Sequence, residues 1–350
     1  MKKYLALFLA LTMIFALAAC GQSSTPADTG SSTQSTDTAA PAVEAKHMKV
    51  SHGYAQTHPY HVSLLEFKET VERETNGAII VDIYSDAAMG TSQDEIEGVI
   101  SGTQDAAVVA ALAMWQNWSD LAAVEEIPFL FPSYAEARAA FHGDFGDRVI
   151  EEVIEVNGVK AIGIWEFGYR HITNNTRPIV VPEDLAGLKF RVGPSDIRFA
   201  AFEAMGATPM TIAFNELFTA LQQGTIDGQE NPIMTIYSSS FYEPNPYLSL
   251  SGHVYNSGFF VVNQNFWDSL TSEQQEIIAA AGEAGGYRCE ELIDQQESEA
   301  VAAMEEAGVH VNEVDKEAFV AAVQPVWEDF RANYGETANE LLDLALTYCN

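Results

Sequence analysis

The sequence predicts an α/β protein with two lobes around a cleft. Over residues 48–110, apolar residues switch between the two-residue spacing of strands and the wider spacing of helices, in the order β-α-β-α-β. A comparable succession of strands and helices recurs over residues 159–224. Because strands joined by crossover helices form parallel sheets, each stretch is expected to build one α/β unit.

The elements of the first unit follow from apolar spacing and from turn residues. We expect a strand from Met48, a helix over residues 60–75, a strand over 78–84, a helix over 93–101 and a short buried strand over 105–110. Gly77 and Gly102 follow the two helices, and a glycine just after the last apolar residue is a common helix stop.

The second unit continues in the same way and ends in long helices. The expected elements are strands over residues 159–165 and 188–192, helices over 197–205 and 215–223, and a mostly helical stretch over 316–348. A long helical segment also covers residues 271–308. Its glycines, Gly282, Gly285 and Gly286, indicate a kink or a close packing contact.

The N-terminus has the pattern of a secretory signal. Lys2 and Lys3 precede an apolar stretch that is too short and wrongly flanked for a membrane span. Leu17-Ala-Ala-Cys20 then resembles the lipobox of bacterial lipoproteins, in which the cysteine becomes the lipidated first residue; a plain signal peptide is the alternative. We expect a lipoprotein signal peptide over residues 1–19. Residues 20–46 are expected to hold the lipidated Cys20 and a disordered linker of Ser, Thr and Ala.

The net charge excludes one class of partner. The chain has a formal net charge of -33 at pH 7, with 17 Lys and Arg residues against 50 Asp and Glu residues. Proteins that bind nucleic acids need basic surface to neutralise phosphates, so nucleic acid is excluded as a partner. The same charge argues against broad contact with an anionic membrane beyond a lipid anchor.

Three cysteines are present, and their spacing matches no zinc or redox motif. With Cys20 assigned to the lipid, Cys289 and Cys349 are left. In an exported protein two such cysteines can form one disulfide, and two unpaired buried thiols are the alternative. No metal and no cofactor is expected.

Against this acidic background, four of the nine arginines gather in one segment of 29 residues. They are Arg170, Arg177, Arg191 and Arg198. The planar guanidinium group binds a carboxylate through two parallel hydrogen bonds, which the point charge of a lysine cannot do. An organic anion is therefore the first ligand to consider.

Several motifs around these arginines carry a resemblance to a known family. They are residues 168–178 (GYRHITNNTRP), 182–192 (PEDLAGLKFRV), 206–209 (GATP), 216–224 (ELFTALQQG) and 227–232 (DGQENP). Together they resemble the substrate-binding proteins of tripartite ATP-independent periplasmic (TRAP) transporters, in the dicarboxylate-binding branch. The resemblance extends over most of the mature chain, and the combination is far more specific than any one motif.

The resemblance implies a two-lobed α/β clamp like that of periplasmic binding proteins, with a long helix spanning both lobes. It implies an N-terminal lobe of residues 47–167 and 257–296, and a C-terminal lobe of residues 168–256 and 297–350. In this family a small organic carboxylate binds between the lobes. The loaded protein delivers it to a permease of one small and one large membrane subunit, driven by an ion gradient. The implied protein is an extracytoplasmic monomer, lipid-anchored to the cell membrane, and not an enzyme.

The family's binding residues match four positions of the second unit. Arg191 matches the arginine that holds the ligand carboxylate, and Arg170 matches a second arginine at the ligand, with a structural ion pair as its alternative. Asn231 matches a residue that donates a hydrogen bond to the ligand, with a turn residue as its alternative. Phe214 matches an aromatic residue that packs on the ligand, with a core residue as its alternative.

In the first unit, the loops that follow strands are the expected contributors, because open α/β sheets bind ligands at the carboxyl ends of their strands. The candidates are His52, Gln56, His58 and Trp115, with Asn256 added from an expected crossover between the lobes. His52 or His58 is suited to recognise a second carboxylate or a hydroxyl group.

Two arginines of the cluster are expected to be ordinary surface charges. Pro178 follows Arg177, which favours an extended surface segment, and Arg198 falls on a helix as a solvated residue. Relatives that bind sialic acid carry acidic residues where this chain has Ser92 and Ala110, so sialic acid is not expected. A four-carbon dicarboxylate, a sugar acid or another hydroxy acid stays open.

Two other functions compete with this one. An exported hydrolase is disfavoured, because the sequence has no Gly-x-Ser-x-Gly, His-Glu-x-x-His or Gly-x-Gly-x-x-Gly motif. A solute-binding lipoprotein of an ABC importer, or a ligand-sensing surface protein, would share the clamp and the anchor. Only the arginine-bearing motif favours the TRAP family over these.

Overall fold

The computed structural model describes residues 45–349. The predicted signal peptide, the lipidation site at Cys20 and nearly all of the predicted linker lie outside the described residues.

The strands are β1 (Lys46–Ser51), β2 (Ile79–Tyr84), β3 (Ala106–Ala110), β4 (Val159–Asn174), β5 (Lys189–Val192), β6 (Thr208–Thr211), β7 (Gly228–Pro232), β8 (Tyr247–Leu250), β9 (Tyr255–Asn263) and β10 (His310–Glu313). The α-helices are α1 (Pro59–Glu74), α2 (Ser92–Ser101), α3 (Tyr134–Phe141), α4 (Asp144–Val149), α5 (Asp196–Ala204), α6 (Leu217–Gln222), α7 (Ile233–Ser238), α8 (Gln264–Asp268), α9 (Ser272–Glu306), α10 (Lys316–Ala322), α11 (Gln324–Asn333) and α12 (Gly335–Leu346). In this part of the chain, none of the helices combines the length and the apolarity that crossing a membrane requires.

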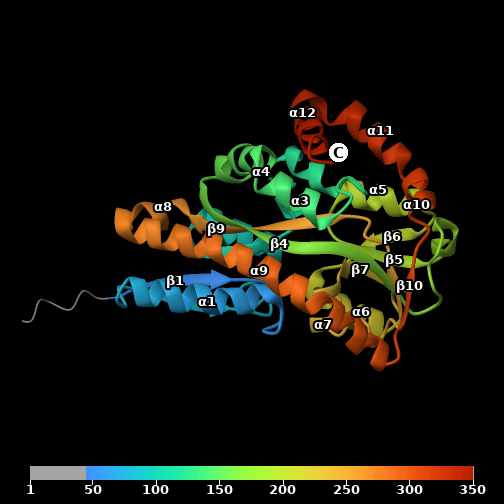
Figure 1. Cartoon of the computed structure of the whole chain (residues 1–350), viewed down its shortest axis with the longest axis horizontal. Coiled ribbons are helices and arrows are strands. Elements are labelled where there is room, and N and C mark those ends of the chain that lie inside the picture. The colour runs from blue at the N-terminus through green and yellow to red at the C-terminus, as the bar shows by residue number, and fades with distance from the viewer. Residues whose placement is uncertain (1–44, 350) are drawn as a thin grey trace, which may run out of the picture. The chain divides into compact units, whose positions relative to one another are not determined.

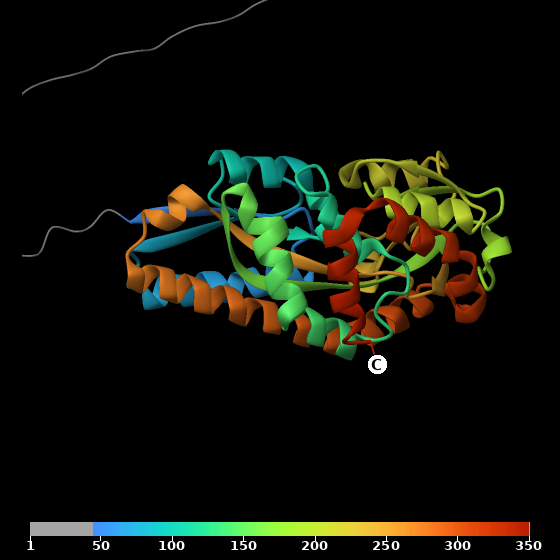
Figure 2. The ribbon, with the colours of Figure 1, turned by 90° about the horizontal axis from the view of Figure 1, so that it is seen from above.

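The predicted β-α-β-α-β order of the first unit is confirmed. β1 pairs in parallel with both β2 and β3, and α1 and α2 are the crossover helices. Side chains of β3 serve two apolar cores: Val108 shares one with Leu64 of α1, and Val109 shares the other with Ile96 of α2. All five residues of β3 are therefore buried, as expected of a parallel strand with helices on both faces. Figure 2 shows α1 and α2 on opposite sides of these strands.

Strand β4 joins this group of strands to a second one. Its first part pairs antiparallel with β9, and its last residues, from Arg170 to Asn174, pair antiparallel with β7. The strand order is β2-β1-β3-β9-β4-β7-β5-β6, with β8 and β10 off this path. β5 pairs in parallel with β6 and β7, so a second parallel group forms beyond β4. The chain is thus a mixed α/β fold with two groups of parallel strands, while the residue boundaries of the two lobes stay a prediction.

Helix α9 is unbroken over its 35 residues and passes from α1, across β4, to α7 (Figure 1). Its glycines mark close packing. A Cβ atom at Gly282 would lie 2.5 Å from Ile162 O, and one at Gly285 would lie 2.6 Å from Trp165 Cζ2. The buried Trp165 ring fills this contact, and its Nε1 donates a hydrogen bond to Gly282 O at 3.0 Å. Small residues thus let the helix backbone approach β4, which both groups of strands share.

The structure also tests the predictions for the C-terminal helices and for the two cysteines. The helical C-terminus is confirmed as α10, α11 and α12, with α11 packed on α5 and α12 on α4. Cys289 and Cys349 are both free thiols rather than a disulfide. Cys289 Sγ donates to Glu166 O at 3.2 Å, and Cys349 Sγ donates to Leu130 O at 3.3 Å.

Candidate functional site

A cavity of about 350 Å³ opens between the two groups of strands. One side, here called the neutral wall, is made by lining residues within 53–54, 87–93 and 110–117, which follow β1, β2 and β3. The other side, the charged wall, is made by lining residues within 167–170, 191–198 and 211–215, together with Asn231. Both walls therefore lie at the ends of strands, which is where open α/β sheets bind ligands.

Arg191 on β5 is the group in this cavity best suited to an anion. Its side chain is only 4 % exposed, and its Nε donates a hydrogen bond to Ile212 O at 3.0 Å. Its two terminal nitrogens have no hydrogen-bond partner among residues 45–349. Burial lowers the pKa of Arg191 to about 10, partly offset by the charge of Glu230, so the guanidinium is protonated at neutral pH. A buried cation without a partner is unfavourable, and an anionic ligand would relieve it.

The other eight arginines all have partners within the protein. Seven of them form ion pairs with carboxylates: Arg73, Arg138, Arg148, Arg170, Arg198, Arg288 and Arg331. Arg177 donates instead to the backbone oxygens of Asp184 and Ala186. Among residues 45–349, Arg191 is therefore the arginine whose two terminal nitrogens are available to donate a pair of hydrogen bonds to a ligand.

Beneath the cavity, Glu230 bridges two further arginines. Arg170 donates to both carboxylate oxygens of Glu230, with Nη2 2.9 Å from Oε1, and its Nη1 donates to Asn256 Oδ1 at 3.1 Å. Arg198 pairs with Glu230 at 3.2 Å and also with Glu126. Although burial opposes it, Arg170 and Arg198 hold the pKa of Glu230 well below its usual range. Two arginines thus face two glutamates, and their formal charges cancel.

This network corrects one prediction. Arg198 was expected to be a solvated surface residue, but it is 1 % exposed and lines the cavity. Its position on α5 turns it towards two carboxylates that lie far away in the sequence, Glu126 and Glu230. Sequence spacing alone carries no signal for such pairs. Arg177, by contrast, lies away from the cavity as expected.

The structure brings together the four predicted residues of the second unit. Arg191, Arg170, Asn231 and Phe214 all line the charged wall. Asn231 Oδ1 accepts a hydrogen bond from Arg170 Nη2 at 3.0 Å, which orients the amide. The Phe214 ring meets the edge of Tyr54, from the neutral wall, at a centroid distance of 5.4 Å.

The histidines predicted from the first unit do not reach the cavity. His52 is fully buried, with Nε2 3.0 Å from His61 Nδ1, and burial lowers its pKa to about 3. His58 is fully buried at the start of α1, where Nε2 lies 3.3 Å from Thr235 Oγ1 and burial lowers its pKa well below the usual value. Both rings are neutral at physiological pH, so neither fits the predicted role of meeting a carboxylate.

Three more predicted residues also lie outside the cavity lining. Gln56 is exposed and donates to Ser85 Oγ at 3.3 Å. Trp115 is fully buried beside Trp118, with ring centroids 6.2 Å apart. Asn256 is fully buried and accepts from Arg170, so it can act on a ligand only through that arginine.

Several lining residues were missed. Tyr54 lies on the neutral wall in a loop that was expected to contribute, whereas Asn117 lies on the same wall two residues beyond the last residue expected there, Trp115. The sequence does not show which of these side chains face inward. Ser92 and Ala110, the positions used against sialic acid, both line the cavity. Within residues 45–349 no cluster of His, Cys, Asp and Glu side chains has the arrangement of a metal site.

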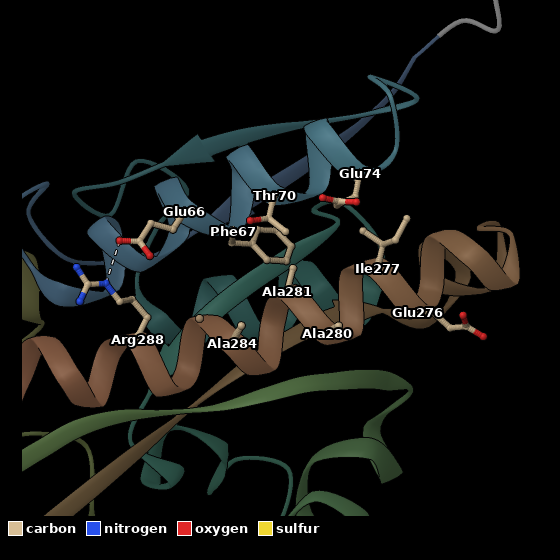
Figure 3. A pocket seen from close by; sticks show the side chains of 11 residues that line it. Glu66, Phe67, Thr70, Glu74, Glu276, Ile277, Ala280, Ala281, Ala284 and Arg288 are labelled. Carbon is tan, nitrogen blue, oxygen red and sulfur yellow. Dashed lines mark hydrogen bonds and ion pairs between the residues drawn. The ribbon is translucent and has the colours of Figure 1, made fainter.

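A larger cavity, of about 430 Å³, lies between α1 and α9 (Figure 3). Its floor is apolar, with Phe67 and Ala281 facing one another. The arginine that lines it, Arg288, is paired with Glu66 at 2.9 Å. Glu74 and Glu276 add negative charge to its edge. This cavity offers an anion no unpaired donor, so the cavity at Arg191 is the better candidate.

Comparison with known proteins adds independent findings. Residues 50–333 match the family described as bacterial extracellular solute-binding protein, family 7. The 2,3-diketo-L-gulonate-binding periplasmic protein YiaO of Escherichia coli strain K12 is 33 % identical over 80 % of this chain and 85 % of its own.

Two solved structures extend this comparison. A sugar acid binding protein from Advenella mimigardefordensis, in complex with galactonate, has a TM-score of 0.83 and 29 % identity, covering 87 % of this chain and 99 % of its own. A TRAP periplasmic solute binding protein from Shewanella oneidensis, with bound succinate, has a TM-score of 0.82 and 25 % identity, covering 87 % of this chain and 100 % of its own.

Proposed function

Because the chain belongs to bacterial extracellular solute-binding protein family 7, the solute-binding family of TRAP transporters, we propose that it captures a small organic carboxylate between its two walls and delivers it to a TRAP permease. The family is one of solute-binding transport proteins and not of enzymes. One solved relative holds galactonate and another holds succinate, so membership alone leaves the class of acid open.

The observation that carries this proposal is the unpaired guanidinium of Arg191. A ligand carboxylate would accept two parallel hydrogen bonds from its terminal nitrogens, which is the strongest charge-assisted geometry available. Arg170 lies on the same wall, where Glu230 and Asn231 fix its orientation before any ligand arrives. Such preorganisation lowers the entropic cost of binding.

Closure of the clamp follows from contacts on both walls. The ligand would dock first on the charged wall, and the neutral wall would then close over it, because the closed form makes contacts that the open form lacks. Tyr54 supports this step, since its ring already reaches across the cavity to Phe214 and lies 5.0 Å from Phe167. The aromatic rings would exclude water from the carboxylate site.

We also propose the setting in which this happens. The protein is an extracytoplasmic monomer, and the lipobox-like Leu17-Ala-Ala-Cys20 supports a lipid anchor on Cys20. The partners are the small and the large membrane subunit of a TRAP permease. The alternative, a binding protein of an ABC importer or a sensor, is less well supported because the match over residues 50–333 is to the TRAP-type family.

The experiment is a thermal-shift screen of residues 47–350 against a library of organic acids, followed by calorimetry. A specific acid should raise the melting temperature by mass action. Arg191→Ala should lower the affinity for that acid at least about tenfold, and Arg191→Lys should also weaken it, because a point charge cannot replace the bidentate pair. Arg177→Ala is the control. Unchanged affinity in Arg191→Ala, or no acid that binds, would refute the proposal.

A further inference from the structure

We infer that the cavity selects an acid with one carboxylate and a hydroxyl-rich remainder, so that a polyhydroxy monocarboxylate binds in preference to a dicarboxylate of the same skeleton. This inference rests on the proposed function, because it takes Arg191 to be the receptor of one carboxylate. It goes further by assigning the chemistry of the opposite end of the ligand, from the charges and hydrogen-bonding groups of the two walls.

The first step is the charge balance of the cavity. Among residues 45–349, the cations that line it are three arginines: Arg170, Arg191 and Arg198. Glu230 and Glu126 already offset Arg170 and Arg198. One surplus positive charge is left, at Arg191, and it matches one carboxylate. A second carboxylate would enter the cavity with no cation to pair with, and an unpaired buried charge is strongly disfavoured.

The second step concerns the N-terminus of α2, a feature of the neutral wall that could attract an anion. Thr91, Ser92 and Gln93 bring this helix end to the cavity. The chain's own Asp94 already places a carboxylate there: its Oδ2 accepts hydrogen bonds from the backbone nitrogen and from the hydroxyl of Thr91, each at 2.7 Å. The charged Asp94 carboxylate repels a second ligand carboxylate from the position where the helix dipole would favour one.

The third step concerns the hydrogen-bonding groups that the neutral wall offers to a ligand. The side chains of Ser92 and Asn117 make no hydrogen bond within residues 45–349, and neither does Asn215 across the cavity. Gln93 Nε2 contacts only Met114 Sδ, a weak acceptor, at 3.5 Å. Hydroxyl and amide groups both donate and accept hydrogen bonds, as ligand hydroxyls do, whereas a carboxylate only accepts. These free groups therefore match hydroxyls better than they match a second carboxylate.

Calorimetry on matched pairs of acids tests this directly. Each pair shares one carbon skeleton and differs only at the end, where a CH2OH group replaces a carboxylate: galactonate and galactarate, gluconate and glucarate, erythronate and meso-tartrate. In every pair that binds, the monocarboxylate should bind at least about tenfold more tightly. A dicarboxylate that binds equally or more tightly, or one that gives the largest thermal shift in the whole library, overturns the inference while leaving the proposed function intact. Failure of every acid overturns the proposed function itself.

A variant of the neutral wall gives a second, independent readout. Asn117→Arg places a cation where the second carboxylate would lie, at an exposed position that should tolerate the longer side chain. The ratio of galactonate to galactarate affinity should fall at least about fivefold, with Asn117→Gln as the size control. An unchanged ratio would contradict the claim that the missing cation excludes the second carboxylate. Arg191→Ala should weaken both members of a pair, which separates loss of the common site from loss of selectivity.

Discussion

The two walls of the cavity differ in the elements that form them and in how deeply their side chains are buried. The arginines of the charged wall, Arg170, Arg191 and Arg198, are each less than 5 % exposed and come from β4, β5 and α5. The polar groups of the neutral wall lie at a helix start and in loops, and Ser92 and Asn117 are partly or fully exposed. In the proposed function, the carboxylate is therefore recognised by the buried framework of the protein. Discrimination among acids is assigned to surface side chains, whose substitution should affect the fold little.

The largest expected change in stability comes from removing the carboxylate of Glu230, which pairs with two arginines of the charged wall. Glu230→Gln leaves Arg170 and Arg198 without their shared partner. Removing one member of a buried ion-pair network costs about 3–5 kcal/mol, so the free energy of unfolding in urea should fall by that amount. Glu216→Gln, at an exposed position, is the control and should change it by less than about 0.5 kcal/mol. A loss as small as that of the control would mean that the network contributes little to stability.

A second test uses pH and the helix behind the neutral wall. Burial raises the pKa of Glu95 on α2 from 4.5 to about 8, so the folded protein keeps this proton while the unfolded chain releases it. Stability should therefore fall as the pH rises from 4.5 to 8, and Glu95→Gln should remove that part of the fall. The variant should be equal to the wild type near pH 4 and more stable by about 4 kcal/mol at pH 8.

Urea unfolding across this pH range measures the difference. Glu97→Gln is the matched control, because Glu97 is exposed on the same helix and should show no such divergence. Parallel pH profiles of wild type and Glu95→Gln would show that Glu95 is ionised in the folded protein.

The smallest expected change in stability comes from replacing Arg191, the cation without a partner for its terminal nitrogens. Arg191→Met removes a buried charge that lacks a protein partner, so the ligand-free protein should become more stable by about 1–2 kcal/mol. The same change should abolish measurable binding of the acid, since the carboxylate loses its receptor. Denaturant unfolding without ligand and calorimetry with ligand give the two readouts. A variant that is less stable than the wild type would mean that Arg191 serves the fold and not the ligand.

Much of the fold could be predicted from the sequence, and the failures have a common physical cause. β1, α1, β2, α2 and β3 were predicted because apolar spacing and glycine stops are local signals. β9 was not predicted, because all nine of its residues are buried and it lacks the alternation of a half-exposed strand. β4 was predicted only to residue 165, although it runs to Asn174 and carries Arg170 into the site.

The predictions for the candidate site were likewise correct for some residues and wrong for others. The unusual gathering of arginines in an acidic chain drew attention to Arg191 and Arg170, and both line the cavity. His52 and Trp115 were drawn from the correct loops, but each is turned into the interior. A loop position restricts where a residue lies along the chain, whereas the direction of its side chain depends on what packs around it.

The sequence by itself determined the class of this protein, through its α/β order and its family motifs, and it pointed to Arg191 as the proposed receptor of the ligand carboxylate. These depend on residue identity and local spacing, which the sequence states directly. Only the tertiary structure decided which charges remain unpaired. Glu126, Arg198 and Glu230 lie more than 30 residues from one another, and they meet only because the segment Asp120–Glu126, α5 and β7 fold together. Together with Arg170 their formal charges cancel, which leaves Arg191 as the unpaired cation that lines the cavity within residues 45–349. A buried charge without a protein partner is unfavourable, so it favours an anionic ligand.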